Sequence, residues 1–254
     1  MIEAMAVLEQ TEAYEARGLG EGGRIRLGRL ADLLLSSPIN VTAARSVEEI
    51  ELHHFLDCLE LLQLPAVHAP GVRVVDVGAG GGLPALVLGI ALPQASVTAI
   101  DSIGKKCDFV RRAVEELELG NVAVECVRAE EYGRGVGRER FGVAVSRAVG
   151  PLALVAELCA PLIEVGGLFV AMKGRLDTSE WKEGVSALGI LGVDQVEQIP
   201  VTPFAGAQHR CFVVGRKTSH TPASLPRRPG VATKRPLGSG GGKRGRVRER
   251  REGL

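Results

Sequence analysis

The sequence predicts an α/β fold in which a mostly parallel sheet has helices on both faces. Two observations support this prediction. From residue 72 onward, short apolar runs alternate with segments of helical periodicity, and a glycine-rich loop directly follows the first run. The composition agrees: 254 residues, 45% of them hydrophobic and 33 of them glycine, can form a large buried core with many tight turns. This composition excludes disorder as the main state.

Residues 1–65 are predicted to form a small N-terminal helical region. Residues 1–36 are compatible with helix and contain a break around 18–23. The run Ser46-Val-Glu-Glu49 is a capping-box signature, which predicts the start of a further helix that Pro65 ends. The opposite face of that helix carries His53, Asp57 and Glu60. Its apolar face has helical spacing and consists of Leu52, Phe55, Leu56, Leu59 and Leu62.

Residues 66–217 are predicted to hold a seven-stranded sheet. Strands are expected at 72–77, 96–100, 121–127, 141–145 and 167–172, with two closing strands near 194–200 and 211–215. Helices are expected from Pro84, where proline fits the first turn, between 101 and Gly120, near 151–163, and over 178–188.

Residues 218–254 form a basic tail rich in proline and glycine, and no regular structure is predicted from about residue 221. Residues 216–254 contain 12 basic and 2 acidic residues, a net charge of +10. Because the whole chain has a net charge of +1, residues 1–215 carry −9. An acidic body with a basic tail indicates a polyanionic partner, and the alternative is a solvated terminus that only aids solubility.

The cysteines and the N-terminus indicate a reducing, cytoplasmic environment. The five cysteines are scattered without CxxC spacing, which predicts neither a disulfide framework nor a metal site. Glu3 and Glu9 stand where a secretory signal needs basic and apolar residues. No charge lies between Asp76 and Asp101, but five glycines and two prolines interrupt that stretch, so we expect no membrane helix.

The sharpest signal for a binding site is VDVGAGGGLP at 75–84, directly after the first predicted strand. Glycines such as Gly78 and Gly80 let the backbone turn sharply and approach a ligand at the start of the next helix. The dinucleotide fingerprint G-x-G-x-x-G is not met, because Leu83 occupies its third glycine position. This departure disfavours an NAD-dependent oxidoreductase.

Two carboxylates indicate the ligand's chemistry. Asp76 lies at the end of the first strand, where it disfavours a pyrophosphate but suits an ammonium group, directly or through water. Asp101 ends the second strand, where a carboxylate can accept hydrogen bonds from two ribose hydroxyls. A ligand with an amino-acid end and a ribose but no phosphate is S-adenosyl-L-methionine. The alternative is a glycine-rich turn that binds no ligand.

Further candidates follow the third and fourth strands at the same edge of the sheet. Ala129 and Glu130 follow the third strand, where an adenine would lie. Arg147 follows the fourth strand and could contact the ligand's carboxylate or a substrate phosphate. The alternative role of Arg147 is an ion pair with Glu130 or Asp76.

At this point the chain resembles the glucose-inhibited division protein B family, which are 16S ribosomal RNA guanine-N7 methyltransferases. The matching segments run in order from about residue 40 to 238. They are NVTA (40–43), HHFLDCLEL (53–61), VDVGAGGGLPALVLGIALP (75–93), DSIGKKCDFV (101–110), RAEE (128–131), SRAVGPL (146–152), GGLFVAMKG (166–174) and PRRPGVATKRPLG (226–238). Leu83 and Gly150 depart from the commoner phenylalanine and alanine, and the segment beyond Leu237 is extra.

The resemblance implies a class I (Rossmann-like) methyltransferase fold and methyl transfer from S-adenosylmethionine to N7 of one guanine in the decoding-region loop. It also implies cofactor contacts at Gly78, Leu83, Ala129, Glu130 and Arg147. The implied partner is 16S rRNA or the 30S subunit. We expect the protein to act as a monomer. Alternatives are a methyltransferase on another substrate and a non-catalytic RNA-binding ribosome assembly factor.

No catalytic base is assigned. Guanine N7 has a free lone pair and no proton to lose, so the reaction needs only in-line placement and desolvation. His53 and His54 are interpreted as structural. The chain has few aromatic residues for stacking, so RNA recognition is expected through phosphates. The candidate contacts are Lys173, Arg175, His209, Arg210, Arg227, Arg228, Lys234 and Arg235.

Overall fold

The computed structural model describes residue 6 and residues 8–238 and confirms the predicted seven-stranded, mostly parallel sheet. Its strand order is β3-β2-β1-β4-β5-β7-β6. The first five strands pair in parallel, whereas β7 runs antiparallel to both β5 and β6. The strands are β1 (Arg73–Val77), β2 (Ser96–Asp101), β3 (Val122–Cys126), β4 (Phe141–Arg147), β5 (Ile163–Lys173), β6 (Val193–Pro200) and β7 (Cys211–Lys217).

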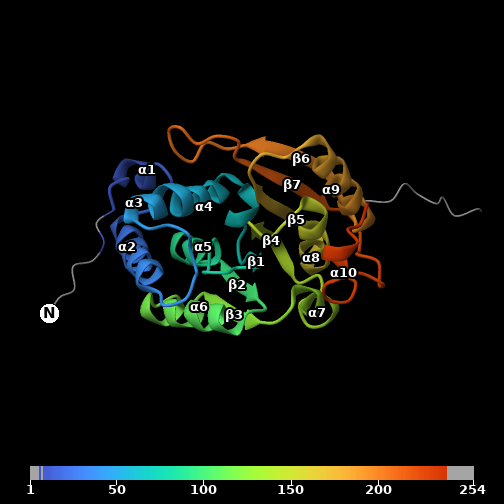
Figure 1. The fold of residues 1–254 in the computed structure, drawn as a ribbon, viewed down its shortest axis with the longest axis horizontal. Coiled ribbons are helices and arrows are strands. Elements are labelled where there is room, and N and C mark those ends of the chain that lie inside the picture. Colours follow the sequence, from blue (N-terminus) through green and yellow to red (C-terminus); the bar gives the residue numbers. More distant parts are fainter. Residues whose placement is uncertain (1–5, 7, 239–254) are drawn as a thin grey trace, which may run out of the picture.

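Helices cover both faces of the sheet, as the alternating pattern predicted (Figure 1). One layer contains α1 (Thr11–Glu15), α2 (Glu21–Ser36), α3 (Val47–Ile50), α4 (Asp57–Leu59), α5 (Ala85–Ala91) and α6 (Gly104–Glu116). The other contains α7 (Ala129–Arg134), α8 (Leu152–Cys159), α9 (Thr178–Ile190) and α10 (Val231–Lys234). Short 3-10 turns lie at Glu60–Gln63, Pro65–His68 and Ala160–Leu162.

Two hydrophobic clusters form the core, one on each face of the sheet. Because strand side chains alternate, Val74 packs into the cluster under α2 and α5, while Val75 and Val77 pack into the cluster under α8 and α9. Asp76 shares the α5 face with Val74, and it accepts a hydrogen bond from Ala85 N at the start of α5. The alternation of side chains along a strand therefore decides which helical layer each polar strand residue faces.

The N-terminal helical run starts as predicted but is less regular than its spacing suggests. The Ser46 hydroxyl accepts a hydrogen bond from Glu49 N at 3.2 Å, which confirms the helix cap. A π-helical segment, Glu51–Leu56, then interrupts the α-helical geometry. Asp57 and Glu60, on the polar face of the predicted helix, are buried. This burial is compensated by charge pairing, because Asp57 meets Arg147 and Glu60 meets Arg17.

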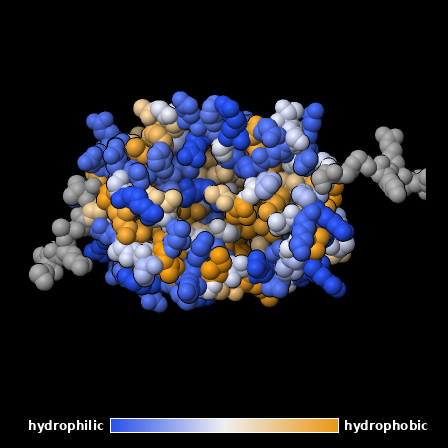
Figure 2. Space-filling model, viewed as in Figure 1, coloured by the Kyte–Doolittle hydropathy of each residue, from blue (hydrophilic) through white to orange (hydrophobic). Residues whose placement is uncertain are grey.

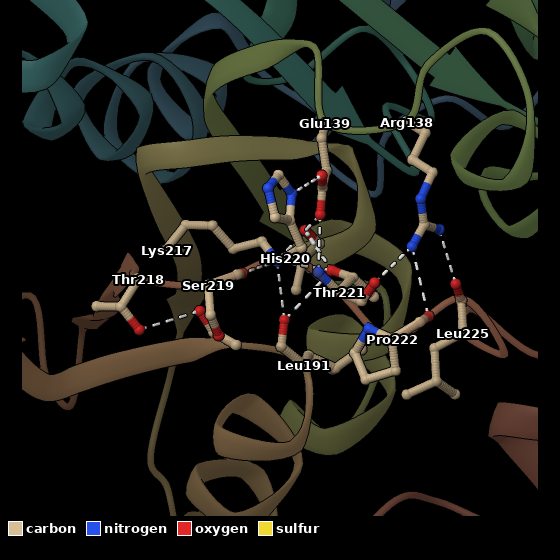
Figure 3. A network of polar contacts seen from close by, with 12 residues as sticks. Arg138, Glu139, Leu191, Lys217, Thr218, Ser219, His220, Thr221, Pro222 and Leu225 are labelled. Atoms are coloured by element: carbon tan, nitrogen blue, oxygen red, sulfur yellow. Dashed lines mark hydrogen bonds and ion pairs between the residues drawn. The ribbon is translucent and has the colours of Figure 1, made fainter.

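The prediction of no regular structure beyond about residue 221 was wrong for the described part of the tail. Helix α10 lies there, and Figure 3 shows how the preceding segment is fixed. The fully buried Lys217 Nζ donates to Leu191 O, Ser219 O and Thr221 Oγ1 at 2.7–2.9 Å. Glu139 adds an ion pair with Lys217 at 3.5 Å. Burial lowers the pKa of Lys217 to about 8, an effect that Glu139 opposes.

Further along, the tail is held by carboxylates buried in the second helical layer. Glu157 is fully buried and accepts hydrogen bonds from Arg227 N and Arg227 Nε, both at 2.8 Å. Arg138 also binds the carbonyls of Thr221 and Leu225 (Figure 3). Local composition missed these contacts because each joins residues 70 or more positions apart. Residues 239–254, the rest of the predicted tail, lie outside the described residues.

Figure 2 shows many hydrophilic residues on this face, with apolar residues between them in groups. The large exposed hydrophobic residues of the described chain are spread along the sequence, from Ile25 to Ile190. Within the described residues, none of the helices is both long and apolar enough to cross a membrane.

Candidate active site at the carboxyl ends of the strands

The glycine-rich loop joins β1 to α5 and is fixed to the end of β2. Gly78 N and Ala79 N donate to Ile100 O at 2.9 and 3.0 Å. Gly78 has a φ of 76°, and a Cβ at that position would lie 2.4 Å from Val149 Cγ2, so glycine is required there. Gly80 has a φ of 58°, and a Cβ there would have no neighbour closer than 3.9 Å. The loop is thus tightly packed at Gly78 and open at Gly80.

Asp76 is a buried carboxylate with one oxygen that lacks a partner. Its Oδ2 accepts a hydrogen bond from Ala85 N at 2.9 Å, while Oδ1 has no hydrogen-bond partner within the described structure. Burial raises the pKa of Asp76 to about 7, against the opposing effects of the Ala85 N–H and the nearby Arg147. A buried acceptor without a donor is costly, which is typical of a position that meets a ligand or an ordered water.

Asp101 ends β2 and organises the same loop. Its Oδ2 accepts a hydrogen bond from Gly80 N, and its Oδ1 accepts one from Ile103 N, both at 2.9 Å. Each ionised oxygen has a further lone-pair direction, so the carboxylate can still accept ribose hydroxyls. The structure therefore brings Asp101 and Gly80 together, as expected from the sequence, and adds a structural role for the aspartate.

The remaining predicted cofactor contacts have mixed surroundings. Ala129 begins α7 and is largely buried, and Glu130 beside it accepts a hydrogen bond from Gly230 N at 3.1 Å. Glu130 thereby joins this edge of the sheet to the tail segment. Leu83 is buried, packs in the hydrophobic cluster under α5 and donates its N–H to Ala79 O. Their role in holding a cofactor stays a prediction.

Arg147 forms its ion pair with a residue other than the two that the sequence suggested. Its NH1 donates to His53 O at 3.1 Å and lies 3.4 Å from Asp57 Oδ2. The partner is therefore Asp57 of the N-terminal helical run and not Glu130 or Asp76. Arg147 and Asp57 are 90 positions apart, so local sequence patterns cannot pair them. The family resemblance was the one sequence signal that linked the two residues, because it includes both HHFLDCLEL at 53–61 and SRAVGPL at 146–152.

His54 is held as a neutral, structural side chain. Its Nε2 lies 2.6 Å from Thr42 Oγ1, and its Nδ1 lies 3.3 Å from Arg147 NH1. Burial lowers the pKa of His54 to about 4, and the positive charge of Arg147 lowers it further. Thr42 belongs to the NVTA segment, so these contacts connect that segment to the end of β4.

A cavity of about 350 Å³ opens at the carboxyl ends of β4 and β5 and at the amino end of the antiparallel strand β7. Its lining includes His53, His54 and Asp57 from the N-terminal run, and Arg147 and Val149 from the segment after β4. Val149 also touches the position where a Cβ at Gly78 would lie. The cavity therefore lies beside the glycine loop. Neither the glycine-rich motif at 75–84 nor the SRAVGPL segment at 146–152 could predict this contact from its own sequence.

The predicted RNA contacts fall into two groups. Around the cavity, Arg210 lies 4.0 Å from Asp57, Arg175 NH2 lies 2.9 Å from His209 Nε2, and Lys173 forms an ion pair with Glu180 at 2.7 Å. On the tail segment, Arg228, Lys234 and Arg235 are exposed, whereas Arg227 is bound to Glu157. Lys173 and Arg227 are thus engaged in contacts within the fold.

Comparison with known proteins identifies the family. A family model described as "GidB: rRNA small subunit methyltransferase G" matches residues 28–208. The chain belongs to the GidB family. This confirms the resemblance found in the sequence, although the PRRPGVATKRPLG segment at 226–238 lies beyond the matched range.

Individual GidB relatives are similar over most of their length. The chain is 43% identical over 206 residues to the ribosomal RNA small subunit methyltransferase G of Rubrobacter xylanophilus, covering 80% of this chain and 78% of that protein. It is 42% identical over 201 residues to the protein of the same name from Deinococcus radiodurans, covering 78% and 79%.

Solved structures agree on the fold of this GidB protein. The S-adenosylmethionine-dependent methyltransferase SibL gives a TM-score of 0.53 at 17% identity, covering 81% of this chain and 72% of that chain. A SAM-dependent O-methyltransferase from Thermotoga maritima gives 0.51 at 15% identity, covering 76% and 72%. The predicted class I methyltransferase fold is confirmed.

Proposed function

We propose that this GidB-family protein transfers a methyl group from S-adenosylmethionine to N7 of a specific guanine in 16S rRNA. The observation that carries the proposal is the contact of Val149 with both parts of the site. It lines the cavity of about 350 Å³ and also closes on Gly78 of the glycine loop. A methyl donor on the loop and a base in the cavity would therefore be neighbours, as direct transfer requires.

The residues present fit S-adenosylmethionine. The unpartnered Oδ1 of Asp76 suits the ligand's ammonium group, directly or through water, and Asp101 suits its ribose hydroxyls. The open backbone at Gly80, between these carboxylates, gives the ligand room. Gly78, Leu83, Ala129, Glu130 and Arg147 complete the proposed cofactor site. When bound, the cofactor supplies an electrophilic methyl group on a sulfonium sulfur.

The chain's own contribution to catalysis is placement and removal of water. Guanine N7 needs no deprotonation before it attacks, so the site needs no general base. His54 agrees with this reading, because burial lowers its pKa to about 4 and its ring nitrogens are engaged with Thr42 and Arg147. The cavity walls would orient the base and exclude solvent from the transfer path.

The RNA would reach the cavity across a second hollow of about 400 Å³ that Arg175, His209 and Arg210 line. Arg210 lines both hollows, so a continuous row of basic side chains leads to the cavity. We therefore retain Arg175, His209, Arg210, Arg228, Lys234 and Arg235 as phosphate contacts. We do not retain Lys173 and Arg227 as phosphate contacts, because they form ion pairs with Glu180 and Glu157.

The proposal is tested by methyl transfer from labelled S-adenosylmethionine to unmodified 16S rRNA and to 30S subunits. N7-methylguanine is located by strand cleavage at the modified site. Label at one guanine of the decoding-region loop supports the proposal, and comparison of the two substrates distinguishes naked RNA from the assembled subunit. Cofactor binding without transfer to either substrate would refute it and favour another substrate or a ribosome assembly factor.

We further infer that the enzyme acts as a cytoplasmic monomer. Five unpaired cysteines support a reducing compartment, and light scattering of the purified protein measures the oligomeric state.

A further inference from the structure

Asp57 is the acidic side chain among the described residues that line the cavity. It projects from the start of α4, immediately after the π-helical segment, and only 7% of its side chain is exposed. A buried carboxylate normally has several short hydrogen bonds, because its desolvation is costly. Glu157, which is fully buried, receives two hydrogen bonds from Arg227 at 2.8 Å on one oxygen.

The contacts of Asp57 are long by comparison. Arg147 NH1 lies 3.4 Å from Oδ2, at the outer limit of a hydrogen bond. Arg210 Nε lies 4.0 Å from Oδ1, which is an ion pair without a hydrogen bond. Within the described part of the chain, Oδ1 therefore has nearby positive charge but no hydrogen-bond donor. The two arginines hold the carboxylate in place and leave its lone pairs available toward the cavity.

Guanine is the base that matches such a group. Its Watson–Crick edge presents two adjacent donors, N1–H and N2–H₂, and an ionised carboxylate has two adjacent acceptors. Adenine presents an acceptor at N1 and is mismatched there. N7 lies on the opposite edge of the purine, so a base held by its Watson–Crick edge leaves N7 directed away from Asp57. On another wall of the cavity, Val149 adjoins the glycine loop where the methyl donor is proposed.

We propose that Asp57 is the specificity-determining residue, accepting hydrogen bonds from N1–H and N2–H₂ of the target guanine. Arg147 and Arg210 position the carboxylate. This inference rests on the proposed function, because it assigns a role within the same substrate cavity. It extends the mechanism from placement of a base to selection of guanine by its hydrogen-bond donors.

The test compares guanosine with inosine at the methylated position of an otherwise identical RNA. Inosine lacks the 2-amino group but retains N7 and N1–H. For the wild-type protein we expect kcat/KM to fall about 10-fold or more with inosine, because one hydrogen bond to a charged acceptor is lost. In Asp57→Asn the guanosine reaction slows, and the guanosine-to-inosine ratio falls toward one. Asp108→Asn, an exposed change on α6, is the matched control and keeps the wild-type ratio.

The outcomes separate this inference from the proposed function. Transfer to guanosine RNA with equal rates on inosine RNA overturns the role of Asp57 and leaves the methyltransferase intact. A merely structural Asp57 would slow both RNAs equally in Asp57→Asn, so an unchanged ratio also overturns it. Should Asp57→Asn fail to fold, equal wild-type rates on the two RNAs would still overturn the inference. Absence of transfer to guanosine RNA overturns the proposed function and this inference with it.

Discussion

Replacing the buried carboxylate at the end of β1 should stabilise the ligand-free protein at alkaline pH while it abolishes cofactor binding. Asp76 is fully buried, and Asp76→Asn retains an oxygen that can accept the hydrogen bond from Ala85 N. The substitution removes the charge that burial disfavours, and with it the group that is proposed to bind the ammonium end of S-adenosylmethionine.

The magnitude follows from the pKa of Asp76, which burial raises from 3.8 to about 7. Because the pKa of Asp76 is higher in the folded than in the unfolded protein, its protonation favours the folded state. This stabilisation is complete below pH 3.8, the unfolded pKa, and is lost as the pH rises through about 7, the folded pKa. The full shift of about 3 pKa units corresponds to about 4 kcal/mol, of which about 2–3 kcal/mol is lost between pH 5 and pH 8. Asp76→Asn does not titrate and keeps a constant contribution.

The measurement is urea unfolding of both proteins, without ligand, at pH 5 and pH 8. The free energy of unfolding of Asp76→Asn relative to wild type should rise by about 2–3 kcal/mol between these values. An exposed control, Asp108→Asn, should show no comparable change. In parallel, S-adenosylmethionine should raise the melting temperature of the wild type and leave that of Asp76→Asn unchanged. A stability difference that does not depend on pH would refute the reasoning, because it would mean that Asp76 titrates as an ordinary solvated carboxyl.

Three further changes test other parts of the structure. Asp101→Ala should weaken S-adenosylmethionine binding by about 1–3 kcal/mol, and unchanged affinity in calorimetry would contradict the ribose assignment. Glu157→Gln should lower the free energy of unfolding in urea by about 3 kcal/mol, because it removes the charge that pairs with Arg227, and an effect near zero would mean that this tail contact adds no stability. Truncation after Gly238 keeps the anchored segment but removes six basic and two acidic residues, so RNA affinity should fall with a shallower dependence on salt. An unchanged slope would show that residues 239–254 only aid solubility.

The strands and the two principal carboxylates could be predicted because their signals are local. Strand runs such as 96–100 are mostly apolar and bounded by turn residues, and the predicted runs recur as β1 to β7, although β5 begins four residues earlier than predicted, at Ile163. Asp76 and Asp101 were identifiable because parallel strands bring their carboxyl ends to one edge of the sheet, and the register pairs Val77 with Ile100 beside them. Pattern and topology thus suffice to place these residues near the loop.

Contacts between distant segments could not be predicted in this way. Asp57 pairs with Arg147 across 90 positions, and Glu130 binds Gly230 across 100. The tail looked unstructured because its proline and glycine content says nothing about partners such as Glu139 and Glu157. Those partners lie far from the tail in the sequence, Glu139 in the segment before β4 and Glu157 in α8, so only the folded chain brings them to it. The sequence shows which charges exist, while the fold decides which of them remain free for a ligand.

The N-terminal helical region is therefore part of the site, although composition separates residues 1–65 from 66–217. A Cβ at Gly81 would lie 2.6 Å from Val41 O, so the NVTA segment rests directly on the glycine loop. Thr42 holds His54, and Asp57 reaches Arg147 at the end of β4. The same region thus bounds the proposed cofactor loop and supplies the acidic group of the proposed base cavity. The backbone that touches Gly81 and the carboxylate that lines the cavity therefore belong to one short stretch of chain, residues 41–57.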